Sequence, residues 1–396
     1  MDMISEAKKL QPTIVEYRRK LHACAETGFD LQRTSAFVLR VLSEIGCEAK
    51  KYGKNGVIAY LGRGKRSVLL RADMDALPIM EKTRLPFACK MGRMHACGHD
   101  MHTAMLLGAV QLLKSNEEKL NGRVCFLFQP AEELLQGAKQ AVELGVVKET
   151  GATNAMMLHV LTNTPLQTGT LIVSSPGVSA PSADFFTIYL TGKSCHGSAP
   201  WQGIDVLPVA STIVLSLQEI SARELSFNDP AVLTIGSMQG GVAGNVIADQ
   251  VLLKGTLRAY EESTRVRVKQ RLEEIVKGVA KAFRVKSKVV YEGGCPALVN
   301  DQATSDFAYR VSKELRGVQV YTSAELSAGT KKGEGGSEDF AYIAKEIPSV
   351  MVALSCGEQK DGYVYPLHHP KTRFDESALY IGTATYAQFA YMQLLG

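Results

Sequence analysis

Apolar and polar residues alternate along this chain in two different rhythms. The first 45 residues place their apolar side chains three and four positions apart, which predicts helices. After that segment, short apolar runs bounded by turn residues alternate with further stretches of helical spacing. This order is typical of an α/β domain whose sheet is mostly parallel and flanked by helices.

Polar residues follow four of the apolar runs. In open α/β sheets, ligands bind beyond the carboxyl ends of the strands. The sequence therefore predicts that these polar residues gather at one edge of the sheet and form a site there. The runs are 67–70, 124–128, 155–158 and 350–354, and the residues that follow them are Arg71 to Asp75, Glu132 with Glu133, His159, and Ser355 to Gly357.

The pattern changes between residues 180 and 293. Strand-like and helix-like segments occur there in the order β-α-β-β-α-β, with helices expected at 206–221 and 262–282. This order predicts a small ferredoxin-like α+β sandwich. It would be inserted into one catalytic domain made of residues 1–179 and 294–396.

The composition agrees with a folded protein of two domains. The chain has 396 residues, more than one core usually organises, and its 45% hydrophobic and 21% charged residues are ordinary for a globular protein. The net charge of +5 is spread without a basic block, which argues against nucleic acid as a partner. No segment has the apolar length of a membrane span or the pattern of a secretory signal. We therefore expect no membrane contact and a cytoplasmic location.

Histidine is scarce but clustered. Three of its eight copies lie between residues 94 and 102. Within that segment Cys97 and His99 flank a glycine that lets the loop bend toward a metal ion, and thiolate and imidazole are good ligands for zinc and its neighbours. Asp100 is expected to cap the helix that follows. His102, one turn further, is either a ligand or a packing residue.

Glu132 and Glu133 are adjacent carboxylates that follow a buried type of strand. One could bind a metal ion while the other takes a proton from the attacking water, as metal-assisted hydrolysis requires. His159 would join them at the same sheet edge, and either His368 or His369, from a loop bounded by two prolines, would complete the set. Such a donor set fits two divalent ions better than one closed tetrahedral site.

Several long motifs resemble those of one known family, in the order in which that family has them. They are YRRKLHACAETGF, LLRADMDALPI, MHACGHDMHTAMLLGAV, FLFQPAEE, MMLHV, GGSEDFAY and LHHPKTRFDE. The family is the amidohydrolase branch of the dinuclear metallo-exopeptidases, which contains hippurate hydrolases, N-acyl-amino-acid aminoacylases, N-acetyldiaminopimelate deacetylases and plant auxin-conjugate hydrolases. The resemblance implies a zinc-exopeptidase-like domain that carries an inserted satellite, or dimerisation, domain.

The resemblance also implies a role for each candidate residue. Glu132 would be the general base, and Asp75 would support the catalytic centre without binding the metal. His369 competes with His368 for the place of the last ligand. Two divalent ions, whether zinc, manganese, cobalt or nickel, would be bound by Cys97, His99, Glu133, His159 and His368.

The satellite domain carries three further candidates. By resemblance, His196 in GKSCHGSAPWQGIDV would stabilise the oxyanion or bind substrate, including across a homodimer interface formed by this domain. Asn245 and Arg258 match positions at which relatives hold the carboxylate of the substrate. The planar guanidinium of an arginine suits a carboxylate physically.

The activity implied is hydrolysis of the amide bond of a small N-acyl amino acid. A metal-activated water, with Glu132 as its base, would yield a carboxylic acid and a free amino acid. A metal-dependent dipeptidase or carboxypeptidase is the alternative enzyme, because the same centre cuts peptide bonds. A catalytically silent metal- or ligand-binding protein on the same fold is the alternative from another class, although such a protein would need no base at Glu132.

Overall fold

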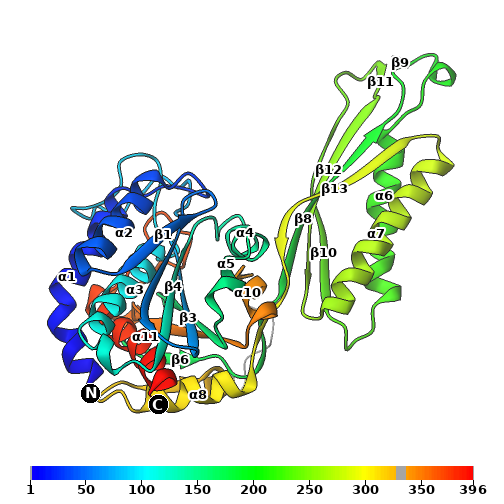
Figure 1. Ribbon diagram of the computed structural model, residues 1–396. Helices are drawn as coiled ribbons and strands as arrows, with labels where there is room; N and C mark the ends of the chain where they lie inside the picture. The colour runs from blue at the N-terminus through cyan, green and yellow to red at the C-terminus, as the bar shows by residue number, and fades with distance from the viewer. Residues whose placement is uncertain (1, 327–335, 396) are drawn as a thin grey trace. The chain divides into compact units, whose positions relative to one another are not determined.

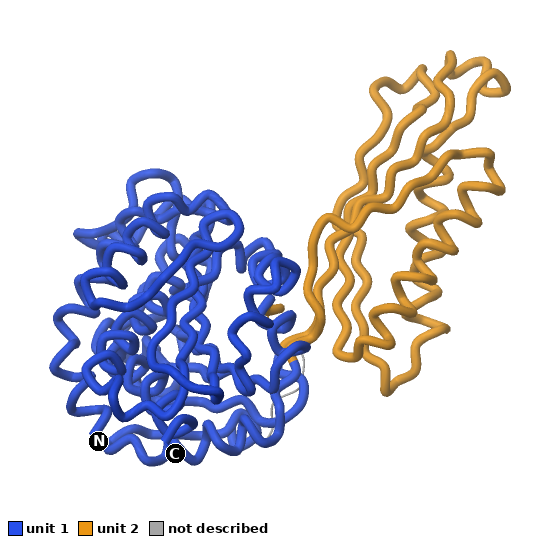
Figure 2. The backbone as a smooth tube through the Cα atoms, in the orientation of Figure 1, with its two compact units in different colours: residues 1–179, 299–334, 339–396 blue, residues 180–298, 335–338 orange. Residues whose placement is uncertain are grey.

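The computed structural model describes residues 2–326 and 336–395, which form two compact units (Figure 2). Each unit has its own hydrophobic core. The domain boundaries expected after residues 179 and 293 stay a prediction. Unit 1 comprises residues 1–179, 299–334 and 339–396, and unit 2 comprises residues 180–298 and 335–338.

Unit 1 contains a mixed sheet with a parallel centre (Figure 1). Within the described residues the strand order is β1-β2-β4-β3-β5-β16-β6-β15, and the series from β4 to β16 is parallel. Strands buried on both faces are near-continuous apolar runs, as VCFLF in β4 is. The predicted α/β fold is confirmed. The strands of unit 1 are β1 (Glu48–Tyr52), β2 (Gly56–Arg63), β3 (Ser67–Asp73), β4 (Gly122–Gln129), β5 (Asn154–Leu161), β6 (Leu171–Val173), β7 (Gly177–Ala180), β14 (Leu298–Asn300), β15 (Val320–Thr322) and β16 (Ser349–Ser355).

Helices cover both faces of this sheet (Figure 1). Helices α1, α3 and α11 contact one another on one face, and α4, α5 and α10 contact one another on the other. In the part of the chain that the structure describes, no helix has the length and apolar character needed to cross a bilayer. The helices of unit 1 are α1 (Met3–Ala23), α2 (Gln32–Ile45), α3 (His99–Lys114), α4 (Gly137–Glu143), α5 (Val146–Thr150), α8 (Gln302–Lys313), α9 (Ser323–Leu326), α10 (Ala341–Glu346) and α11 (Leu379–Leu394).

Two strands continue further than their apolar runs predict. Arg71 and Asp73 lie inside β3, and His159 lies inside β5. Arg71 Nη1 donates to Asp73 Oδ2 over 2.7 Å, and this pairing allows both charged side chains to be buried in the strand. Part of the expected site therefore comes from the last residues of strands and not from the loops beyond them.

Strands β3 and β5 separate toward their carboxyl ends. Their last paired residues are Arg71 and Met157. Beyond that pair, the hydroxyl of Tyr386 in α11 accepts a hydrogen bond from Leu158 N (3.0 Å) and donates one to the Arg71 carbonyl (2.7 Å). A side chain thus satisfies buried backbone groups that a neighbouring strand would otherwise pair.

The described residues of unit 2 form a four-stranded antiparallel sheet with two helices on one face (Figure 1). The sheet order β10-β12-β8-β13 and the chain order β8-α6-β10-β12-α7-β13 are those of a ferredoxin-like fold, as predicted. Helix α7 has the predicted bounds, and α6 continues into a π-helical turn at 220–224. The elements are β8 (Ser182–Thr191), β9 (Cys195–His196), α6 (Leu207–Glu219), β10 (Ala231–Gly240), β11 (Val246–Ile247), β12 (Gln250–Ala259), α7 (Glu262–Ala282) and β13 (Lys286–Cys295).

Two glycines of unit 2 should respond in opposite ways to alanine. A Cβ at Gly255 in the central strand β12 would lie 2.4 Å from Phe186 Cζ and from the Thr234 carbonyl oxygen, whereas one at Gly278 in α7 would meet open space. Gly255→Ala should lower the free energy of unfolding by about 1–3 kcal/mol. Gly278→Ala should raise it by up to about 1 kcal/mol. Urea denaturation measures both, and an unchanged midpoint for Gly255→Ala would contradict the packing.

Candidate metal centre

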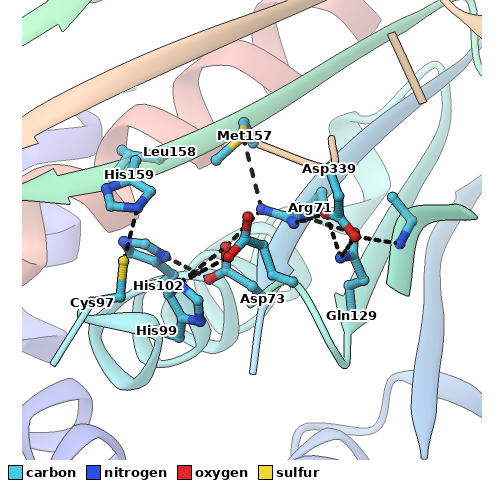
Figure 3. Close-up of polar contacts among 12 residues, drawn as sticks. Arg71, Asp73, Cys97, His99, His102, Gln129, Met157, Leu158, His159 and Asp339 are labelled. Atoms are coloured by element: carbon cyan, nitrogen blue, oxygen red, sulfur yellow. Dashed lines mark hydrogen bonds and ion pairs between the residues drawn. The ribbon is translucent and has the colours of Figure 1, made fainter. Parts of the chain in front are cut away.

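A thiol and two imidazoles meet at the start of α3 (Figure 3). Cys97 Sγ lies 3.5 Å from Nε2 of His159, and a ring nitrogen of His99 lies within 4.8 Å of both atoms. All three side chains are buried. Gly98, with φ +89°, permits this approach, because a Cβ there would lie 2.3 Å from Val160 Cγ2. The glycine brings the loop against β5.

The backbone fixes which nitrogen of each histidine carries a proton. His99 Nδ1 lies 2.8 Å from the Asp75 carbonyl oxygen, and His159 Nδ1 lies 2.8 Å from the Val160 carbonyl oxygen. A carbonyl only accepts hydrogen bonds, so each Nδ1 must donate. Both Nε2 atoms are therefore directed into the cluster, as in a metal-ligating histidine.

The carboxylates of Glu132 and Glu133 face the same cluster. Asp75 holds their turn in place, since its carboxylate accepts hydrogen bonds from the backbone N–H groups of Glu132 (2.9 Å) and Glu133 (3.2 Å). His99 Nε2 lies 3.8 Å from Glu132 Oε2 and 3.9 Å from Glu133 Oε1. Asp75 thus contacts the backbone that carries both carboxylates, and the supporting role expected of it stays a prediction.

His368 and His369 point to different surroundings. His368 adopts a left-handed backbone with φ 64°, and its Nε2 lies 3.6 Å from Glu133 Oε1. The ring of His369 stacks on Tyr365 with centroids 4.5 Å apart, and its Nδ1 accepts a hydrogen bond from Lys371 N. Of these two neighbours, His368 is the one beside the cluster.

The donor set fits a divalent cation. Among the described residues, His99 Nε2 and Glu133 Oε1 are buried polar atoms without a hydrogen-bond partner. Burial, together with the nearby charges of Asp75 and Asp73, raises the pKa of Glu133 to about 7, and burial raises the pKa of the Cys97 thiol. A cation would satisfy these atoms, and mixed S, N and O donors suit zinc, manganese, cobalt and nickel.

His102 is a packing histidine in this structure. Its Nε2 accepts a hydrogen bond from Val160 N (2.8 Å), and its Nδ1 donates to Asp73 Oδ1 (2.6 Å). Burial lowers the pKa of His102 to about 4, so the ring is neutral. Both ring nitrogens are engaged with protein groups, which favours the packing interpretation over the ligand interpretation.

A buried charge network lies beside the cluster, and no role was predicted for its residues (Figure 3). Arg71 bridges Asp73 and Asp339, with Nη2 2.8 Å from Asp339 Oδ1, and Gln129 Nε2 also donates to Asp339. Charges at alternate positions of an otherwise apolar strand, as at Arg71 and Asp73, were the available signal. The partner Asp339 lies 268 residues away in the motif GGSEDFAY, which gave no sign of a pairing with Arg71.

The expected cap of α3 by Asp100 is wrong. The N-cap residue is Gly98, and Asp100 lies in the first turn. Its Oδ2 accepts hydrogen bonds from Arg18 Nε (2.7 Å) and His22 Nδ1 (2.8 Å), and His22 Nε2 in turn lies 3.1 Å from both oxygens of Glu81. The Asp100 carboxylate thus forms a buried ion pair with Arg18 instead of a helix cap, and this pair connects α1 to α3.

The three candidates of unit 2 occupy two places. His196 and Asn245 are neighbours at the β9–β11 ribbon, where Gly197 N donates to the Asn245 carbonyl oxygen (2.8 Å), and both side chains are exposed. Arg258 lies near the far end of β12, eight residues after Gln250, which is about 26 Å along the strand. There Arg258 Nη1 donates to Ser337 Oγ. Within unit 2 the structure does not bring Arg258 to His196.

Comparison with known proteins identifies the family. The chain matches peptidase family M20/M25/M40 over residues 69–392. It is 36% identical to an N-acetyl-L-cysteine deacetylase of Bacillus subtilis, over 93% of this chain and 85% of that protein, and 32% identical to a thermostable carboxypeptidase of Saccharolobus solfataricus, over 98% of each. A dinuclear metal-binding peptidase of the M20 family from Bacillus subtilis superposes with a TM-score of 0.78 at 32% identity, covering 98% of this chain and 99% of that one.

The class of protein follows from fold, site and similarity together: it is a metal-binding hydrolase of the amidohydrolase kind. More particularly, the chain belongs to peptidase family M20/M25/M40. The family resemblance inferred from its motifs is confirmed.

The Asp100 network should make stability depend on pH through His22. Burial would lower the pKa of His22, but attraction to Asp100 and hydrogen bonds to Asp100 and Glu81 outweigh it and raise this pKa. Protonated His22 therefore stabilises the fold fully below pH ~6.5, and this stabilisation is lost as pH rises through the raised folded pKa. His22→Gln should consequently cost most free energy of unfolding near pH ~6, and the cost should shrink toward pH ~9. Urea denaturation across that range measures it, and a constant cost would contradict the assignment.

Proposed function

We propose that this protein is a metal-dependent hydrolase of N-acyl amino acids, which it cleaves to a carboxylic acid and a free amino acid. The observation that carries the proposal is one buried cluster in which a thiol, two imidazoles and a carboxylate converge beside a second carboxylate. The first group of donors suits metal binding, and the second carboxylate suits proton transfer. The similarity to a deacetylase of an N-acyl amino acid supports this substrate class.

The proposed ligands of two divalent ions are the five side chains that surround the cluster. When bound, such ions lower the pKa of a coordinated water and polarise the carbonyl of an amide. His368 is preferred to His369 because it lies beside Glu133, whereas His369 stacks on Tyr365. The proposed ligands are Cys97, His99, Glu133, His159 and His368.

Glu132 is the proposed general base. Its side chain is largely buried, with an exposed fraction of 8%, and Asp75 accepts a hydrogen bond from its backbone N–H. In this position Glu132 takes a proton from the attacking water and returns it to the leaving amine, because a carboxylate within hydrogen-bond reach can serve as base and then as acid. Asp75 acts through Glu132 and Glu133 and is a positioning residue.

The proposed substrate contacts come from unit 2. The exposed imidazole of His196 would stabilise the oxyanion, and Asn245 and Arg258 would hold the carboxylate of the amino acid. His196 and its neighbour Asn245 both lie too far from Arg258 along unit 2 for one copy to present all three to one small substrate. We therefore include a homodimer in the proposal, in which a second copy supplies one of these groups.

Two isosteric variants, one residue apart, test the division of labour. Glu132→Gln should lower kcat by about 10²–10⁴-fold and leave bound metal unchanged, because it removes a base and no ligand. Glu133→Gln should lower the bound metal itself, because an amide is a poorer ligand than a carboxylate. Steady-state kinetics and metal analysis of purified protein measure both. Full turnover by Glu132→Gln, or loss of its metal, would overturn the assignment.

A substrate panel separates the enzyme classes. Protein reloaded with zinc or manganese should release amine from N-acetyl, N-benzoyl or indoleacetyl amino acids, and chelated protein should release none. Release from dipeptides only would favour the alternative of a dipeptidase or carboxypeptidase, which the similarity to a carboxypeptidase supports. Bound metal without any release would favour a silent binding protein.

A further inference from the structure

Two buried side chains take the place of a strand where β3 and β5 separate. Leu158 N donates to the Tyr386 hydroxyl (3.0 Å), and Val160 N donates to His102 Nε2 (2.8 Å). Alternate residues of a strand direct their N–H groups to the same side, so both groups face the place that β3 has left. His102 therefore accepts the hydrogen bond of the Val160 N–H, as Tyr386 accepts that of the Leu158 N–H.

The state of the His102 ring follows from its partners. Val160 N–H can only donate, so His102 Nε2 must accept and Nδ1 must carry the proton. That proton is directed at Asp73 Oδ1, 2.6 Å away. Arg71 holds the other oxygen of Asp73 at 2.7 Å. The tautomer and the orientation of His102 are thus fixed at both ends.

Val160 connects His102 to the metal cluster. Its N–H is held by His102, and its carbonyl accepts the hydrogen bond of His159 Nδ1 (2.8 Å). Its side chain lies against Gly98, where a Cβ would be only 2.3 Å from Cγ2 of Val160. One residue therefore contacts the ring of His159 and the loop that presents Cys97. A displacement of Val160 changes the spacing of two proposed ligands.

We propose that His102 is a positioning residue for the metal centre, which acts through Val160 to set the ring of His159 relative to Cys97. This inference rests on the proposed ligand set. The sequence position of His102, the fourth residue of α3, does not by itself indicate this role. The bond to Val160 carries the effect, and the bond to Asp73 sets the tautomer that makes it possible.

Two amide variants separate the two hydrogen bonds of His102. In His102→Gln the side-chain amide reaches the position of Nε2 and can accept the hydrogen bond from Val160 N–H. In His102→Asn the amide reaches only the position of Nδ1 and can donate only to Asp73. The measurement is a titration of metal-free protein with cobalt in the absence of substrate. It gives the affinity for cobalt and the charge-transfer absorption between cobalt and the thiolate of Cys97. His102→Asn should bind cobalt about 10–100-fold more weakly, with an altered thiolate band, and His102→Gln should stay within about threefold of wild type.

Thr103→Val is the matched control. Thr103 lies next to His102 on α3, and its hydroxyl donates to the Asp73 carbonyl over 2.7 Å, a buried bond that does not involve Val160. The variant should leave cobalt affinity and the thiolate band unchanged. Equal losses in Thr103→Val and His102→Asn, or in the two His102 variants, would overturn the proposal. Absence of a thiolate band in wild type would overturn the proposed ligand set, whatever substrate the enzyme takes.

A measurement on the unaltered protein covers the case in which His102→Asn does not fold. Nitrogen-15 NMR of histidine-labelled wild type should show His102 protonated at Nδ1 and unprotonated at Nε2, with little change when metal is added. The Nε2 signals of His99 and His159 should move on the same addition. Metal-dependent movement of His102 Nε2, or a proton on it, would overturn the assignment.

Discussion

Two buried carboxylates at the end of β3 organise the site, because a carboxylate removed from water is costly unless hydrogen-bond donors surround it. Asp73 is satisfied by Arg71 and His102, and Asp75 by the backbone N–H groups of Glu132 and Glu133. These donors come from three segments, which are β3 itself, α3 and the turn after β4. The hydrogen bonds that satisfy Asp73 and Asp75 therefore hold α3 and the turn after β4 against β3.

The geometry of the proposed ligands follows from this arrangement. Carbonyl groups hold Nδ1 of His99 and His159, so both rings present Nε2 to the sulfur and carboxylates of the cluster. Oriented ligands and a nearby carboxylate that binds no metal are what metal-assisted amide hydrolysis requires. The separation of β3 from β5 makes room for this set, and Tyr386 satisfies the backbone groups exposed by it.

Much of the fold was predictable because it depends on local pattern. Helix α7 and the β-α-β-β-α-β order of unit 2 follow from the spacing of apolar residues. Candidates such as Cys97 and His99 were visible because histidine and cysteine gather in one short segment. Asp100 shows the limit of such local patterns. Its sequence position favours a helix cap, but its carboxylate pairs with Arg18, which lies 82 residues away.

His102 shows the same limit within the site. Its spacing allows a ligand or a packing residue, and only the contact with Val160 from another strand decides between them. The link from Arg71 to Asp339 spans 268 residues and was equally invisible. Partners brought together by tertiary structure, and not the residue types themselves, assign these roles.

Anomalous diffraction from crystals of the zinc-loaded protein tests the central claim most directly. The account predicts two zinc peaks, each about 2.0–2.3 Å from donor atoms of Cys97, His99, Glu133, His159 or His368, with Glu132 left uncoordinated. His102 would remain bonded to Val160 and Asp73. A single peak, or a zinc ion bound by His102 and Asp73, would contradict it.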